Sequence, residues 1–174
     1  MTPHQHNMRG FTLIEMLVSV ALFSIVMLSA TAALFTVIGA NAQTQSLNSM
    51  MTSTSFSLES MSRLIRTGTN FSCDGGGDCV SGGNRLTFTS QDGQTVTYRL
   101  FNGQVLREMG GITAPLSGSS VNITLLRFYV IGTPVGDGLQ PRILIVMRGQ
   151  TVGSAHQEDF AVQTTVSARR IDLE

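Results

Sequence analysis

The chain has 174 residues, and its 11 basic residues, all arginine, balance its 11 acidic residues to a formal net charge of zero at pH 7. A chain this neutral lacks the broad basic surface that binds nucleic-acid phosphates, so we expect no bulk binding of nucleic acid. About a third of the length is the N-terminal region described next, and the remainder suffices for one globular head of roughly 100 residues.

A long apolar run follows a short basic leader. Residues 1–10 contain one arginine, two histidines and no acid, and from Phe11 to Gly39 every residue except Glu15 is apolar, small or hydroxylated. About 20 such residues are enough to cross a bilayer as a helix. We therefore predict a leader over residues 1–10 and the membrane-spanning half of a helix over residues 11–40.

The carboxylate of Glu15 is out of place in this run. Burying an ionised group at mid-membrane costs at least about 2.5 to 3.5 kcal/mol, so such a group is expected to have a partner. If the chain is cut between Gly10 and Phe11, the new α-amine is cationic at neutral pH and can pair with Glu15, within one subunit or between two. The alternative is a tolerated polar residue near the membrane edge, where snorkelling and the positive helix N-terminus lower its cost.

The run from Gly10 to Glu15, Gly-Phe-Thr-Leu-Ile-Glu, followed by an apolar helix, resembles the class III leader of type IV pilins and type II secretion pseudopilins. The resemblance implies that a prepilin peptidase cuts after Gly10 and N-methylates Phe11. It also implies that Glu15 docks the incoming subunit against the N-terminus of its neighbour. The implied partners are the peptidase, other pilin or pseudopilin subunits contacted through the N-terminal helix, an assembly platform in the inner membrane, and membrane lipid.

An ordinary secretory signal is the rival interpretation of this N-terminus, because Ala40-Asn41-Ala42 has the small-x-small form of a cleavage site. The apolar region of such a signal usually has about 7 to 15 residues and no acid. The run here is nearly twice as long and carries Glu15 close to its start. We therefore favour the pilin-type leader.

Charge also predicts the orientation in the membrane. Arg9 precedes the apolar run, and no charged residue follows Glu15 until Glu59. Positively charged flanks tend to stay on the cytoplasmic side. We expect a single pass of the inner membrane, with the N-terminus in the cytoplasm and the head in the periplasm or outside the cell, where the tip of a filament is a further location.

The helix is expected to continue beyond the membrane as an amphipathic half over residues 41–68. No proline occurs between Pro3 and Pro115, and Gly68 with Asn70 is a plausible end. The Ser/Thr-rich stretch 52–57 is a point where the helix could break, because these residues favour caps and turns. Apolar residues recur at helical spacing and predict one inward stripe, with Thr54 filling a gap: Leu47, Met50, Met51, Leu58, Met61, Leu64 and Ile65.

A β-rich globular head is predicted over residues 69–174, where glycines punctuate stretches of alternating apolar residues. Asn102-Gly103 is a strong signal for a hairpin turn, and Gln91-Asp92-Gly93 predicts another turn. The expected fold class is α+β and pilin-like: a long N-terminal helix, half in the membrane and half amphipathic, packed on one antiparallel sheet. Strands are predicted at residues 85–90, 95–101, 104–108, 121–131, 142–148 and 160–168.

Cys73 and Cys79 are the only cysteines, and the loop between them contains three glycines. In an oxidising compartment we expect them to form a disulfide, which stabilises by only about 2 kcal/mol because it closes a short loop. A reduced pair and half of a metal site are the alternatives. Two thiols with no nearby histidine do not make a zinc site.

No arrangement for catalysis is apparent, so we expect no enzyme activity, no cofactor and no metal. His156, Glu158 and Asp159 are interpreted as a solvated turn before the last strand. Calcium is a weaker alternative for four acids in glycine-rich loops, which lack the spacing of a recognised calcium loop: Asp74, Asp78, Asp92 and Asp137.

The layout of helix, meander and final strand is similar to minor pilins and pseudopilins of the J or W type. Many major type IV pilins have a proline where this chain has Ala32, which points away from a major subunit. The expected function is a structural subunit that helps initiate or cap a type IV pilus or a type II secretion pseudopilus. The alternative is a tip module that binds a substrate, a surface or DNA through Phe101, Phe128 or loop arginines; a signal-anchored secreted domain is a third.

Overall fold

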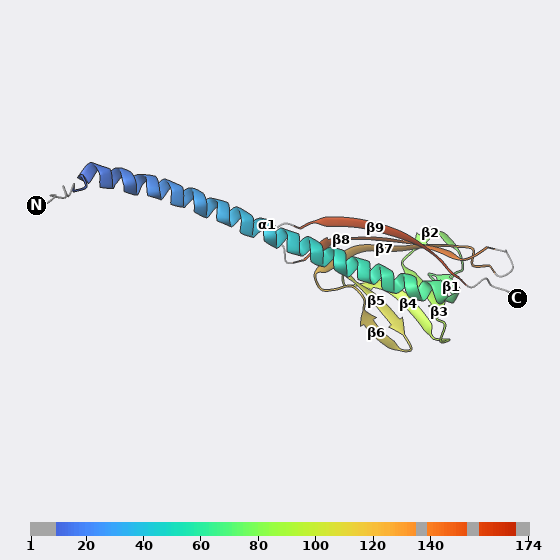
Figure 1. The fold of residues 1–174 in the computed structure, drawn as a ribbon. Coiled ribbons are helices and arrows are strands. Elements are labelled where there is room, and N and C mark those ends of the chain that lie inside the picture. Colours follow the sequence, from blue (N-terminus) through green and yellow to red (C-terminus); the bar gives the residue numbers. More distant parts are fainter. Residues whose placement is uncertain (1–9, 135–138, 153–156, 170–174) are drawn as a thin grey trace, which may run out of the picture. The chain divides into compact units, whose positions relative to one another are not determined.

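The computed structural model of the chain describes residues 10–134, 139–152 and 157–169. Two compact units divide between Ala42 and Gln43, so that unit 1 is Met1–Ala42 and unit 2 is Gln43–Glu174. A single helix, α1 (Leu13–Thr67), has residues in both units (Figure 1). The predicted helix therefore forms, two residues shorter at its start than expected.

The part of α1 in unit 1 is apolar and exposed along its length. It is long and apolar enough to cross a membrane, and none of its most apolar 18-residue window is buried. In hydrocarbon, polar groups must find partners within the helix itself. Five hydroxyls do so by donating hydrogen bonds to the carbonyl four residues earlier: those of Ser19, Ser24, Ser29, Thr31 and Thr36.

The part of α1 in unit 2 buries one narrow stripe. Met51, predicted to face inward, is 59% exposed, because it lies a hundred degrees around the helix from buried Met50. The predicted stripe is otherwise buried or half-buried. Two small residues, Ser57 and Ser62, were not expected in it. The buried residues recur every three or four positions, except that Ser62 directly follows Met61: Met50, Thr54, Ser57, Met61, Ser62 and Ile65.

The Ser/Thr-rich stretch does not break α1. Ser57 Oγ lies 2.8 Å from the carbonyl oxygen of Ser53 and 3.1 Å from that of Leu116. Ser53 Oγ in turn accepts a hydrogen bond from the backbone N–H of Gly118, at 2.8 Å. These hydroxyls therefore hold a loop of the head against the helix and leave its backbone ladder intact.

The helix ends at Thr67, one residue before the predicted end, and the position that follows has no room for a side chain. A Cβ on Gly68 would lie 2.5 Å from the ring of Phe88, and Asn70 adopts a positive φ of 54°. The chain then turns directly into the first strand.

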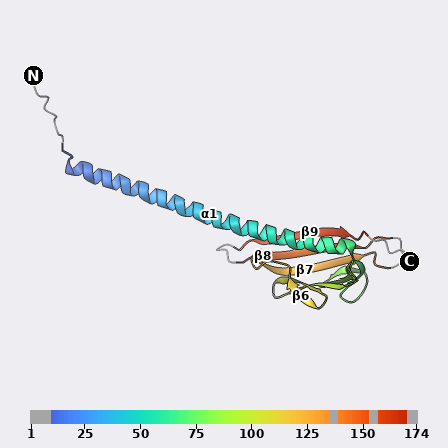
Figure 2. The same ribbon diagram turned by 60° about the horizontal axis from the view of Figure 1, so that its bottom comes forward.

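Unit 2 contains two antiparallel sheets rather than the one predicted (Figures 1 and 2). The five-stranded sheet has the order β1-β3-β4-β5-β6, and the four-stranded sheet has the order β2-β7-β8-β9. The first comprises β1 (Thr69–Cys73), β3 (Arg85–Thr89), β4 (Thr95–Phe101), β5 (Gln104–Met109) and β6 (Ile112–Pro115). The second comprises β2 (Cys79–Gly83), β7 (Val121–Ile131), β8 (Arg142–Thr151) and β9 (Asp159–Ser167).

The six predicted strands are present as β3, β4, β5, β7, β8 and β9, and the Asn102-Gly103 turn joins β4 to β5. Three strands were missed. β1 and β2 contain serine, glycine and asparagine, and β6 has only four residues, so none has a clear alternating pattern.

Both sheets and α1 contribute to one core. An aromatic row crosses the five-stranded sheet, where the ring centroids of Phe71 and Phe88 lie 5.4 Å apart and those of Phe88 and Tyr98 lie 5.9 Å apart. The α+β architecture, with a long helix followed by antiparallel sheets, is confirmed. Large buried side chains come from every part of it: Met61, Ile65, Leu86, Leu126, Phe128, Ile143, Ile145 and Met147.

Tyr98 is the polar member of this core. Its side chain is fully buried, and its hydroxyl has no hydrogen-bond partner among the described residues. Burial raises the pKa of Tyr98 to about 12, although the positive charge of Arg107, its cross-strand neighbour on β5, opposes part of that rise.

Replacing Tyr98 with phenylalanine is expected to raise the free energy of unfolding by about 1 kcal/mol at pH 7, because it removes an unsatisfied buried hydroxyl. In the wild type, stability is expected to fall as pH rises from about 10 to about 12, since the unfolded chain loses this proton first. The Tyr98→Phe variant should lose less over that range. Urea unfolding of the full chain in detergent measures both, with half-buried Tyr129→Phe as the control; a destabilised Tyr98→Phe variant would contradict the expectation.

Candidate functional site

The start of α1 has its own cap. Thr12 precedes the helix; its side-chain oxygen accepts a hydrogen bond from the backbone N–H of Glu15 at 3.3 Å, and its carbonyl accepts one from Met16 at 3.2 Å. Glu15 is therefore the third residue of the helix. Thr-x-x-Glu is the sequence pattern of a capping box, so the cap was readable from the sequence, although only Glu15 was singled out.

The Glu15 carboxylate stands at the positive end of the helix. It lies in the first turn, where unpaired backbone N–H groups favour a negative charge. The residue is exposed, and so are its neighbours on the helix. The helix N-terminus therefore stabilises this carboxylate and leaves it accessible.

The predicted cleavage site lies just outside the helix. Gly10 and Phe11 have no helical structure and are exposed, and α1 begins two residues later at Leu13. A Cβ placed on Gly10 would meet no atom within 4 Å. Exposed, irregular backbone near a terminus is where proteases act most readily.

Residues 5–31 match the family model of the prokaryotic N-terminal methylation motif. The chain carries this methylation motif. The match is consistent with the type IV pilin and pseudopilin family, and it confirms the resemblance on which the prediction depended. The methylation motif implies processing by prepilin peptidase and assembly with other pilins, and with the exposed apolar helix it fits a membrane-anchored pilin.

The methylation motif covers residues 5–10 of the leader and the first part of α1 but none of the head. No curated protein and no solved structure matches the chain. The match therefore gives no information on the subtype of the subunit, which only the structure of unit 2 can address.

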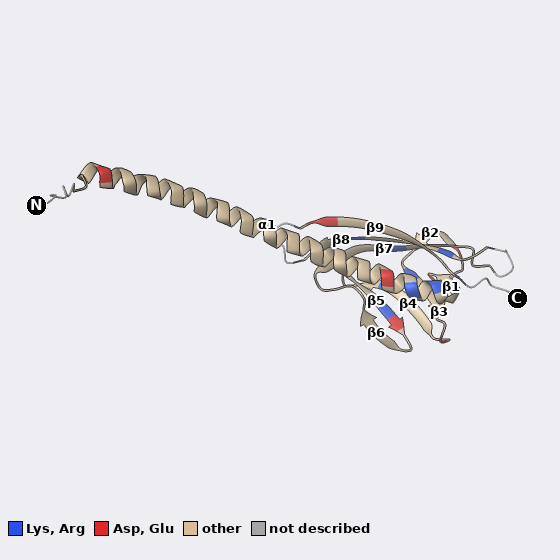
Figure 3. Cartoon of the chain, viewed as in Figure 1, with Lys and Arg blue, Asp and Glu red and all other residues tan. Residues whose placement is uncertain are grey.

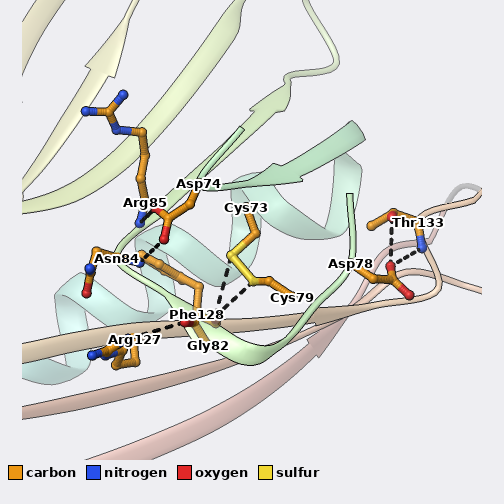
Figure 4. The surroundings of a disulfide bond; sticks show 10 residues. All are labelled: Cys73, Asp74, Asp78, Cys79, Gly82, Asn84, Arg85, Arg127, Phe128 and Thr133. Carbon is orange, nitrogen blue, oxygen red and sulfur yellow. Dashed lines mark hydrogen bonds between the residues drawn. A yellow bond between two sulfur atoms is a disulfide. The ribbon is translucent and has the colours of Figure 1, made fainter. Parts of the chain in front are cut away.

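The predicted disulfide between Cys73 and Cys79 is present (Figure 4). Cys73 is the last residue of β1 and Cys79 the first of β2, so the bond joins strands of different sheets. The two sulfurs lie 3.7 and 3.3 Å from the carbonyl oxygen of Phe128 on β7. Because a disulfide sulfur carries no proton, these are close packing contacts rather than hydrogen bonds. The disulfide therefore links the two sheets as well as closing the loop between the two cysteines.

Two acids beside the disulfide act as hydrogen-bond acceptors for the backbone (Figure 4). Asp74 accepts hydrogen bonds from the N–H groups of Asn84 and Arg85, at 3.0 and 2.9 Å. Asp78 accepts from the N–H groups of Gly132 and Thr133, at 3.1 and 2.8 Å, and from the Thr133 hydroxyl at 2.7 Å. These carboxylates fasten the loop between β1 and β2 to neighbouring segments.

The same hydrogen bonds account for the pKa of Asp78. Desolvation raises the pKa of this carboxyl, but the bonds from Thr133 and Gly132 outweigh that effect and lower the pKa below its usual value. Among the described residues no group of three or more His, Cys, Asp or Glu side chains could hold a metal ion. Of the other acids considered for calcium, Asp92 lies in the turn between β3 and β4, and Asp137 lies outside the described residues.

The proposed polar turn is only partly described, because His156 lies outside the described residues. Glu158 is half-buried and accepts a hydrogen bond from Gln43 Nε2 on α1 at 2.7 Å. Its backbone N–H donates to Thr151 Oγ1 at 3.0 Å. Asp159 begins β9 and is exposed. Glu158 therefore binds the helix rather than standing in a solvated turn.

The prediction that Phe128 contacts a partner of the head was wrong. Phe128 is fully buried and cannot touch a partner, because the inward face of β7 carries it into the core. Phe101 is 52% exposed, and the Arg99 guanidinium carbon lies 5.3 Å from the centroid of its ring.

Gly83, which was not singled out from the sequence, packs tightly against the disulfide region. A Cβ on Gly83 would collide with Cys73 Sγ and would lie 2.7 Å from Asp74 Oδ2. The pair Gly82-Gly83 was the available signal, because adjacent glycines in a strand mark close approach of other groups.

The Gly83→Ala variant is expected to disfavour the disulfide, because the added methyl group occupies the place of the Cys73 sulfur. Mass spectrometry after thiol alkylation should detect free cysteines in a large fraction of this variant and in almost none of the wild type. Gly76→Ala is the matched control, since its Cβ would lie 3.7 Å from the nearest atom, an ordinary contact. A fully oxidised Gly83→Ala protein would contradict the packing described.

Proposed function

We propose that the chain is a minor pilin or pseudopilin, a structural and non-enzymatic subunit that helps initiate or cap a type IV pilus or a type II secretion pseudopilus. The observation that carries this proposal is the match of residues 5–31 to the methylation motif. Prepilin peptidase cuts between Gly10 and Phe11 and methylates the new α-amine. The exposed, non-helical backbone at these residues supports cleavage there.

Glu15 is the docking group in this proposal. Its carboxylate is exposed at the first turn of α1, so an incoming subunit has access to it. The cationic α-amine at Phe11 of a neighbouring subunit is its partner. In the low dielectric of the bilayer each charge is costly alone, and pairing them removes most of that cost. The pair therefore draws one subunit into register with the next.

The apolar helix anchors the subunit before assembly. We assign the N-terminus to the cytoplasm on the positive charge of the leader, with the head on the opposite side of the inner membrane. The helix is unbroken across Ala32, which supports a minor subunit rather than a major pilin with a proline there. Residues 11–40 exchange lipid contacts for contacts with neighbouring helices, and their many small and hydroxylated side chains suit close helix packing.

A second function, tip binding by the head, is favoured by one observation. Phe101 is exposed beside the Arg99 guanidinium, and aromatic and arginine side chains dominate the binding energy of many interfaces. The pair is a candidate contact for a secreted substrate or a surface.

Cleavage is tested by intact mass and N-terminal sequence of the chain expressed with and without a prepilin peptidase. We expect a new N-terminus at Phe11, heavier by one methyl group, only when the peptidase is present. A chain that instead begins near Gln43 would have lost its apolar helix as a secretory signal, and the proposal would fall.

Replacing Glu15 with alanine is expected to reduce incorporation into filaments by about fivefold or more, because a single charge pair in the bilayer contributes on the order of 1 to 3 kcal/mol. The head should stay folded, with its disulfide intact. Glu108→Ala removes an exposed carboxylate from β5 of the head and should assemble normally. Immunoblotting of sheared filaments measures incorporation, and normal assembly of Glu15→Ala would exclude the docking role.

A further inference from the structure

Three exposed arginines meet at the C-terminal end of α1. Arg63 and Arg66 lie on the last turns of the helix, and Arg169 lies just after β9. The backbone N–H of Arg169 donates a hydrogen bond to the carbonyl of Arg66 at 2.8 Å. That bond brings together two segments about a hundred residues apart in sequence. Figure 3 shows this concentration of positive charge at the end of α1.

The arginines line two adjoining hollows. The larger, of about 450 Å³, is lined by Arg66, Thr67, Gln91 and Arg169. The smaller, of about 230 Å³, shares Arg66, Thr67 and Arg169 and adds Glu59, Ser62 and Arg63. Three arginines and one acid, Glu59, thus line these hollows. Guanidinium groups bind carboxylates through paired hydrogen bonds, so these hollows, called the arginine hollow below, suit a carboxylate ligand.

The helix end by itself does not account for this cluster. Cations near a helix C-terminus are stabilised by the backbone carbonyls there. The carbonyl of Arg66, however, already accepts the hydrogen bond from Arg169, and Arg169 itself belongs to a different segment. Arg169 therefore adds a positive charge that stabilisation of the helix C-terminus does not explain.

The opposite end of unit 2 is acidic. Asp159 is exposed at the start of β9, and Glu158 precedes it and is held against Gln43. Arg66 lies 23 residues beyond Gln43 on α1, a separation of about 35 Å at the helical rise. Arg148 is the cation nearest to Asp159 in the sheet register, since it pairs with Ala161 on β9. Figure 3 shows the acidic start of β9 and the basic end of α1 at opposite ends of the head.

We propose that the arginine hollow binds the carboxylates of Glu158 and Asp159 from a second copy of this chain. The two heads lie parallel, displaced by about 35 Å along α1. A contact between two different surfaces of copies displaced along one axis does not close into a ring and can repeat along a filament. The inference rests on the proposed function and deepens it: it favours an initiating stack of several copies over a single capping subunit.

The absence of lysine from the sequence makes this contact directly testable. An Arg66→Lys variant of the full chain, in membranes of cells that also produce prepilin peptidase, has one side-chain amine. A zero-length carbodiimide joins an amine only to a carboxylate in contact with it. We expect a cross-linked dimer in which the introduced lysine is joined to Glu158 or Asp159. Because these residues lie about 35 Å apart within one head, the product can form only between copies.

Two controls define the result. Arg85→Lys places the amine on another exposed arginine, in the five-stranded sheet, and should give severalfold less of this product. The double change Glu158→Gln and Asp159→Asn in the Arg66→Lys chain should abolish it. If Arg66→Lys fails to fold, shown by free cysteines, Arg169→Lys offers the same hollow a second amine.

The alternatives give distinct products. Coupling only to Glu59, or to the carboxylates of residues 170–174 of the same chain, would overturn the inference. So would the absence of dimer from a chain that is cut after Gly10 and enters filaments, and the proposed function would then stand. A chain that is not cut after Gly10 would overturn the proposed function itself.

Discussion

The narrow buried stripe of α1 from Met50 to Ile65 is the contact on which the head depends. Side chains from both sheets belong to the same buried cluster as this stripe, so without the helix some of them would be exposed. The hydroxyls of Ser53 and Ser57 form hydrogen bonds with the loop after β6. The carbonyl oxygen of Arg66 accepts a hydrogen bond from the backbone just after β9. Small residues in the stripe let these segments approach the helix closely. The helix therefore forms one side of the core and also holds the neighbouring segments in place through hydrogen bonds.

The two parts of α1 have opposite relations to water. In unit 1 the exposed residues are apolar and their hydroxyls are satisfied within the helix, which suits hydrocarbon. In unit 2 the exposed residues are mostly polar, and burial is confined to one stripe. Thr12, which lies within the matched methylation residues, caps the helix, so the chain becomes helical just after the predicted cleavage site. The same first turn holds Glu15 exposed where the helix stabilises its charge.

The disulfide and the distribution of charged residues each involve few residues but affect the whole head. The bond between Cys73 and Cys79 joins the edge strands of the two sheets, and Asp74 and Asp78 fix the loop that it closes. Although the net charge is zero, arginines gather at the end of α1 and acids at the start of β9. A neutral composition is therefore compatible with a head that presents opposite charges at its two ends.

The sequence by itself determined the features that depend on local patterns. The apolar run and its motif indicated the helix and the methylation motif, the Asn102-Gly103 turn located a hairpin, and alternation located six strands. Only the tertiary structure decided which faces are covered, because periodicity shows that a face is apolar but not what packs against it. It placed the strands in two sheets, buried Phe128, exposed Met51 and added the short strands β1, β2 and β6. It also brought Arg169 to Arg66, a contact between distant segments that no local pattern encodes.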